Sequence, residues 1–115
     1  MTWEEARQHL CPAIEQTCGA QTEEDIKNGV ESGKFTLWAC EGGAAITELV
    51  QFDRILALSV GLAGGKKSAV KSLLPQIEKY AKDAGCARIM FVGRDGWRKE
   101  YPDFKFGYTM IYKDL

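Results

Sequence analysis

A short polar run follows two glycines near the middle of the chain: Gly64 and Gly65 are followed by Lys66, Lys67 and Ser68. An apolar stripe with helical spacing begins directly afterwards, so the run lies at a predicted helix N-terminus. Free backbone N–H groups and the helix dipole favour anions at this position, and lysine ammonium groups can bind a phosphate. Alternatively, the lysines are solvated surface residues behind a glycine turn. The sequence leaves both interpretations open.

The other residues capable of metal, redox or nucleophilic chemistry are isolated from one another. The four cysteines are Cys11, Cys18, Cys40 and Cys86. No pair has the Cys-x-x-Cys spacing of a zinc or redox site. We therefore predict no metal site and four reduced thiols, packed as small hydrophobic residues. The single histidine, His9, has no partner motif and is predicted to lie on the surface.

Aromatic and basic residues are mixed near the C-terminus. They are Arg94, Trp97, Arg98, Lys99, Tyr101, Phe104, Phe106, Tyr108 and Tyr112. Such mixtures can stack bases and clamp single-stranded nucleic acid. Packing between a helix and a strand explains the same spacing with fewer assumptions, so nucleic acid is not the expected partner.

The length and charge of the chain limit the classes of protein to which it can belong. The 115 residues fit one domain, predicted to span residues 1–115. The 15 basic and 16 acidic side chains give a net charge of −1, which offers no overall attraction to nucleic acid or anionic membranes. No apolar run approaches the roughly 18 residues of a membrane span, and Glu4 and Glu5 do not suit a signal peptide. We expect a soluble, cytoplasmic protein.

Hydrophobic periodicity predicts an α/β domain that begins with helices. A first helix starts at the cap Thr2 and is interrupted at Pro12, which begins a separate turn through Ile14. A second helix starts at Thr22 and ends at Gly33. Strands at 35–40, 44–52 and 55–62 then form an antiparallel meander, with the third strand central. The glycines at 42–43 and 61–65 are predicted to lie in turns.

The second half of the sequence predicts a β-α-β crossover connection. A helix over 66–84 is kinked at Pro75 or begins only after Ser72; the stripe residue Val70 favours the kink. A short strand at 88–92 should lie parallel to the strand at 55–62, because a strand, a helix and a strand form a right-handed crossover. A last helix at 95–101 and a last strand at 108–112 complete the prediction.

This order of elements resembles the GCN5-related N-acetyltransferase (GNAT) fold, a mixed central sheet with an antiparallel meander and a β-α-β crossover, here without the family's first strand. Within that family it is most similar to small acetyltransferase-like proteins of tailed phages. The residues that carry the likeness are Gly33-Lys34-Phe35-Thr36-Leu37-Trp38, Ile77-Glu78-Lys79-Tyr80-Ala81-Lys82-Asp83-Ala84-Gly85-Cys86 and Gly93-Arg94-Asp95-Gly96-Trp97.

The resemblance implies a cofactor, acetyl-CoA, and positions for it. In the family the pantetheine arm lies between the central strand and its parallel neighbour, and the pyrophosphate binds the turn before the crossover helix. The corresponding cofactor-binding residues here are Val60, Gly64, Gly65, Lys66, Lys67 and Ser68. The family's acid and base roles fall on Tyr101, near the last helix, and on Glu48, in the strand beside the central one. Core packing for Tyr101 and a solvent-facing strand position for Glu48 are the alternatives.

One departure from the family pattern keeps two functions open. The pyrophosphate turn falls on residues 65–70, where its leading Arg or Gln and both of its expected glycines are absent. One hypothesis is an acyl-CoA-dependent N-acyltransferase of unknown acceptor. The other is a non-catalytic phage protein with a morphogenesis, virion or host-interaction role, located in the host cytoplasm or the virion. Its partner would be another protein or a second copy of the chain.

Overall fold

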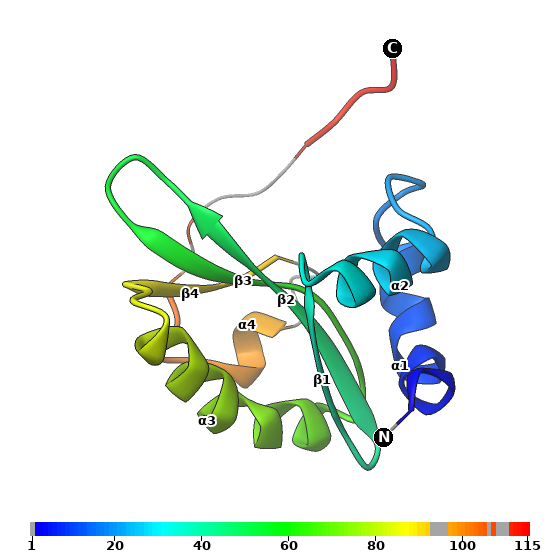
Figure 1. Ribbon diagram of the computed structural model, residues 1–115, viewed down its shortest axis with the longest axis horizontal. Coiled ribbons are helices and arrows are strands. Elements are labelled where there is room, and N and C mark those ends of the chain that lie inside the picture. The colour runs from blue at the N-terminus through cyan, green and yellow to red at the C-terminus, as the bar shows by residue number, and fades with distance from the viewer. Residues whose placement is uncertain (1, 93–96, 106, 108–110) are drawn as a thin grey trace.

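The computed structural model describes residues 2–92, 97–105, 107 and 111–115 as one α/β domain (Figure 1). Two helices come first, α1 (Trp3–Glu15) and α2 (Glu23–Ser32). Three strands follow, β1 (Thr36–Cys40), β2 (Gly43–Gln51) and β3 (Leu56–Gly65). The chain continues through α3 (Lys67–Asp83), β4 (Arg88–Phe91) and the short α4 (Trp97–Glu100). The sheet lies between α1 and α2 on one side and α3 and α4 on the other.

The sheet has the strand order β1-β2-β3-β4. The pairs β1–β2 and β2–β3 are antiparallel. The pair β3–β4 is parallel, with Ala57 beside Arg88 and Val60 beside Phe91. The predicted meander and the parallel crossover through the long helix are therefore confirmed. No helix in the described part of the chain is long and apolar enough to cross a membrane.

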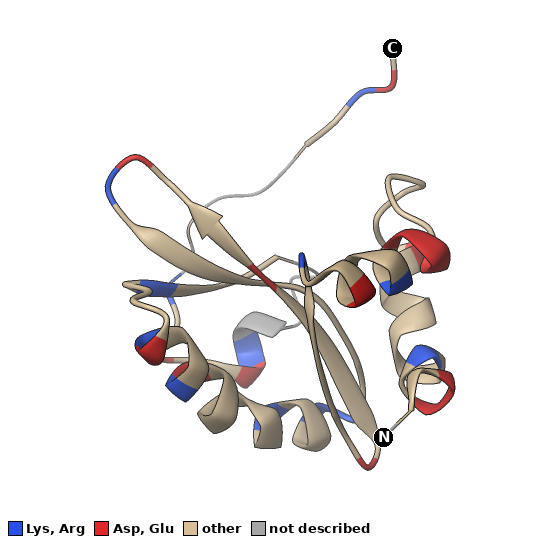
Figure 2. Ribbon diagram, in the orientation of Figure 1, with Lys and Arg blue, Asp and Glu red and all other residues tan. Residues whose placement is uncertain are grey.

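Two hydrophobic cores lie on opposite faces of the sheet, because successive strand side chains alternate in direction. On the α1 face, Leu10 of α1 and Ile26 of α2 pack against Ile46 and Leu62 of the sheet. On the α3 face, the core consists of Ala45, Leu58, Val60, Leu73, Ile77 and Ala81. Charged residues lie mainly on the helices, in the turns and near the C-terminus, and Glu48 is the one charged residue within β1, β2 and β3 (Figure 2).

Both prolines within helices are accommodated at exposed positions. The predicted break at Pro12 is wrong: α1 runs from Trp3 to Glu15 and its N-terminus is capped by the Thr2 hydroxyl, as predicted. Pro12 is exposed, and so is Gln8, whose carbonyl it cannot bond; water can therefore satisfy that carbonyl while Leu10 and Ile14 stay buried. Likewise, α3 begins at Lys67 and passes through Pro75, which excludes a late start after Ser72.

The predicted turn at 61–65 is also wrong. These residues form the second half of β3, because Gly43–Ile46 of β2 pairs with Leu62–Gly65. The predicted last helix is present as α4 in its described part. Most of the predicted strand at 108–112 lies outside the described residues, and its described members, Ile111 and Tyr112, are exposed and outside the sheet.

The cysteines match their predicted packing in part. All four are free thiols, and Cys40 and Cys86 pack against the core of the α3 face. Cys11 is half-buried near Glu23 of α2. Cys18 is exposed, contrary to prediction, because the turn after α1 leaves the core.

Thiol reactivity should follow this burial. Burial raises the pKa of Cys11 and of Cys86, so less of each is thiolate at neutral pH. We expect a thiol-specific colorimetric reagent to modify Cys18 rapidly in the native protein and Cys11 and Cys86 much more slowly. Denaturant without reductant should release four reactive thiols. A count below four would reveal a disulfide and contradict the free-thiol structure.

Candidate functional site

The candidate site lies where β3 and β4 stop pairing. The last β3–β4 partners are Val60 and Phe91, and the Val92 N–H donates to the Val60 carbonyl at 3.1 Å. Strand β3 continues for five more residues, Gly61–Gly65, and within the described part of the chain the only strand that pairs with this segment is β2, through Leu62–Gly65. One edge of β3 therefore offers backbone groups to an extended ligand, in the way that an unpaired strand edge accepts another chain.

A β-bulge stands at the start of this free edge. Ile46 pairs with Leu62 and Thr47 with Val60, so Gly61 is an extra residue without a partner on β2. Bulges bend a strand and increase its twist, and this bulge lies directly after Val60, the last β3 residue that pairs with β4. Gly61 is exposed, and a Cβ atom added to it would meet nothing within 4 Å. A ligand can therefore approach the backbone at Gly61.

The first turn of α3 lies at the far end of the free edge. The N-cap residue Lys66 makes no side-chain cap, and its own N–H donates to the Gly42 carbonyl at 2.8 Å. The first helical bond joins the Val70 N–H to the Lys66 carbonyl. In the described part of the chain, no acceptor meets the N–H groups of residues 67–69. Lys66, Lys67 and Ser68 are exposed, so the sequence-predicted anion site combines free backbone donors with exposed cations.

Glu100 of α4 already binds two of the nearby cations. Its carboxylate lies 3.4 Å from the Lys67 ammonium and 3.2 Å from that of Lys71. The hydrogen bond from Lys71, followed by that from Lys67, holds the pKa of Glu100 below its usual value. An anion at the first turn of α3 would compete with this carboxylate. Sequence reasoning missed Glu100, because it is distant along the chain and no motif connects it with the lysines.

The two predicted cofactor glycines have packing roles. A Cβ atom on Gly64 would collide with the carbonyl of His9, because α1 crosses β3 there in direct backbone contact. Gly65 has a φ of +104°, in the left-handed region that favours glycine, and its added Cβ would collide with the Gly42 carbonyl. His9 itself is half-buried, and not fully on the surface as predicted.

Tyr101 follows α4 directly and packs beside the end of β4. Its side chain is 5% exposed and stacks on Phe91, with ring centroids 4.7 Å apart and planes at 24°. Phe104 lies against both rings, so this part of the predicted aromatic group is core packing. Burial and then the Glu100 charge raise the pKa of Tyr101, which keeps its hydroxyl protonated at neutral pH.

Glu48 lies apart from Tyr101. It pairs with Ser59 in the β2–β3 ladder, and alternation from Thr47 points its side chain toward the α1 face. Tyr101 packs against Phe91, which belongs to the α3 face. The structure thus places Val60, Lys66, Lys67 and Ser68 at the two ends of the free edge of β3, and Tyr101 stacks on Phe91, the partner of Val60. It does not bring the two predicted proton-transfer groups, Tyr101 and Glu48, together. No cluster of potential metal ligands occurs among the described residues.

Comparisons with known proteins identify the fold and nothing more specific. No family model and no curated protein matches the chain. Among solved structures, the chain is similar to TTHA1254 from Thermus thermophilus, with a TM-score of 0.61 and 20% identity over the whole chain and 93% of that protein. A point mutant of the same protein gives a TM-score of 0.61 and 19% identity with the same coverage. At this identity, the match supports a shared fold.

Proposed function

We propose that this domain belongs to the GNAT superfamily and binds an acyl-CoA thioester along the free edge of β3. The observation that carries the proposal is the end of β3–β4 pairing at Val60, directly before the Gly61 bulge. The amide-bearing pantetheine arm can hydrogen-bond to backbone groups of Gly61–Gly65, as a short additional strand would. The pyrophosphate would then reach the N–H groups of residues 67–69 and the ammonium of Lys66.

The reaction supported by this arrangement is transfer of the acyl group to an amine. An amine attacks the thioester carbonyl, the carbon–sulfur bond breaks, and the coenzyme A thiolate must gain a proton. Tyr101, protonated at neutral pH and beside the end of β4, is the candidate donor of that proton. Glu48 is the sequence-predicted candidate base for the amine, although its side chain lies on the opposite face of the sheet from Tyr101. Backbone N–H groups on β3 can stabilise the developing oxyanion.

A second function has its own support in the structure. Glu100 occupies the lysines at the first turn of α3, and Tyr101 is packed between Phe91 and Phe104. Both features are consistent with a domain that has this fold but does not catalyse acyl transfer. A non-catalytic role in virion assembly or host interaction, with a protein partner, is therefore the alternative proposal.

A titration of ¹⁵N-labelled protein with acetyl-CoA tests the binding proposal. We expect the largest amide shifts at Gly61–Gly65 and residues 67–69, because these groups would bond to the ligand. Amides of α2 serve as the internal control and should not move. Shifts spread evenly over the surface, or none at millimolar acetyl-CoA, would favour the non-catalytic alternative. If the expected shifts appear, release of free coenzyme A in the presence of amines, compared with the Tyr101→Phe variant, separates a transferase from a binding domain.

A further inference from the structure

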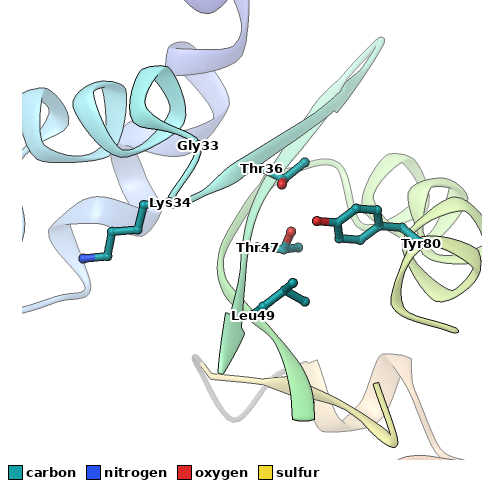
Figure 3. Close-up of a pocket in the computed structure, with 6 residues that line it drawn as sticks. All are labelled: Gly33, Lys34, Thr36, Thr47, Leu49 and Tyr80. Atoms are coloured by element: carbon teal, nitrogen blue, oxygen red, sulfur yellow. The ribbon is translucent and has the colours of Figure 1, made fainter. Parts of the chain in front are cut away.

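A separate cavity lies on the α3 face, between β1, β2 and the last turns of α3. It has a volume of about 110 Å³ and is lined by Gly33, Lys34, Thr36, Thr47, Leu49 and Tyr80 (Figure 3). A single water needs about 10–15 Å³ of such volume, so the cavity can hold a small molecule. The candidate acyl-CoA site lies instead between β3 and β4. The two sites are therefore distinct.

Three hydroxyl groups converge on this cavity. Thr36 and Thr47 are direct partners in the β1–β2 ladder, and Figure 3 shows the Tyr80 hydroxyl directed toward both. Tyr80 is held in place by its edge-to-face contact with Trp38, with ring centroids 5.5 Å apart at 68°. The hydroxyls thus belong to side chains fixed by a strand pair and an aromatic contact.

The hydrogen-bond state of Thr47 specifies what a ligand must provide. Thr47 is 1% exposed, and its hydroxyl oxygen accepts a hydrogen bond of 2.9 Å from the Trp38 indole N–H. Because an indole can only donate, the Thr47 hydrogen remains to be donated, and no described residue accepts it. A buried donor without an acceptor is costly. An oxygen atom on a ligand would satisfy it.

Charge and shape restrict the ligand further. Lys34 is the one permanently charged residue that lines the cavity, and its side chain points away from it (Figure 3). Its ammonium instead lies 5.0 Å from the Phe35 ring centroid. Leu49, which is 40% exposed, and the Tyr80 ring form an apolar wall. These features fit an uncharged molecule that has both hydroxyl groups and C–H surfaces.

We propose that this cavity binds a small uncharged polyhydroxy compound, either a free polyol or the edge of a sugar. Thr47 donates to one ligand oxygen, and Thr36 and Tyr80 exchange hydrogen bonds with neighbouring hydroxyls. The ligand's C–H groups lie against Leu49 and the Tyr80 ring. This proposal does not depend on acyl-CoA binding.

The indole N–H resonance of Trp38 provides a direct probe, because this group bonds to the floor of the cavity. We expect glycerol, methyl α-glucoside or both to shift it saturably in a ¹H–¹⁵N titration, and the two ligands distinguish a polyol from a sugar. Removing one hydroxyl by Tyr80→Phe or Thr36→Val should weaken binding by about 3- to 10-fold, the equivalent of one hydrogen bond. Tyr112→Phe, at an exposed residue outside the cavity, is the matched control and should bind as the wild type does.

Three results would overturn the proposal. The first is a Trp38 shift that rises linearly with either compound and does not saturate. The second is equal affinity in the wild type and in both cavity variants. The third is tighter binding of acetate than of glycerol, which would make the cavity an anion site.

Discussion

Replacing Gly64 with alanine is expected to lower the free energy of unfolding by about 3 kcal/mol, a large loss for one methyl group. The added Cβ would collide with the His9 carbonyl, which is helix backbone and cannot rotate away. Helix α1 must then move off the sheet, and Leu10 and Ile14 lose part of their packing. For a domain of this size the melting temperature should fall by roughly 10 °C or more.

The matched control is Gly61→Ala, three residues earlier in the same strand. A Cβ atom at Gly61 meets open space, and its backbone does not have a positive φ. The control should change stability by less than about 0.5 kcal/mol. Chemical denaturation of both variants measures the difference. Equal losses in the two would show that α1 does not rest on Gly64.

Acetyl-CoA is expected to bind weakly, and replacing Glu100 should strengthen the binding. The first turn of α3 lacks the glycines that let a pyrophosphate approach several amides, and two or three lost hydrogen bonds correspond to roughly 30- to 1,000-fold in affinity. Lysines recover part of this loss through charge, which salt screens. In Glu100→Gln, Lys67 and Lys71 become free to bind phosphate, so affinity should rise about fivefold at low salt.

Isothermal titration at low and high salt measures both effects. Glu24→Gln is the control, because it removes an exposed carboxylate on α2, away from α3, and should leave the affinity unchanged. Tight binding that is insensitive to salt would mean that hydrogen bonds to the β3 edge, and not the lysine charges, supply most of the affinity for acetyl-CoA. An affinity unchanged or lowered in Glu100→Gln would show that the phosphate does not reach Lys67.

The order of elements could be predicted from the sequence because local signals determine it. The Thr22 cap with Asp25 and the left-handed Gly33 define α2, and the stripe through Val70 and Ile77 defines α3. Predictions failed where a distant segment decides the outcome. Gly61–Gly65 looks like a turn locally, but β2 converts it into strand. Pro12 looks like a helix end, but burial of Ile14 extends α1 past it.

The candidate site was predictable only in part for the same reason. The lysines at the start of α3 could be placed, because a helix N-terminus has a sequence signature. Their pairing with Glu100 depends on the docking of α4, which no local pattern reports. The cavity beside Tyr80 is formed by residues from three segments and could not be found from spacing alone.

The Gly61 bulge also gives β3 one residue more than the part of β2 that pairs with it. Val60 faces the core of the α3 face and Leu62 that of the α1 face, which an uninterrupted strand would not allow, because residues two apart share a face. The extra residue shifts the alternation once, between the halves of the strand. Deletion of Gly61 would remove the bulge and leave a regular strand in which Leu62 and Gly64 still face α1, whereas deletion of any other single residue of this stretch would turn part of the strand to the wrong face. Natural sequences of this fold should tolerate insertions and deletions at the β2–β3 turn, but between residues 57 and 65 only the loss of the bulge residue itself.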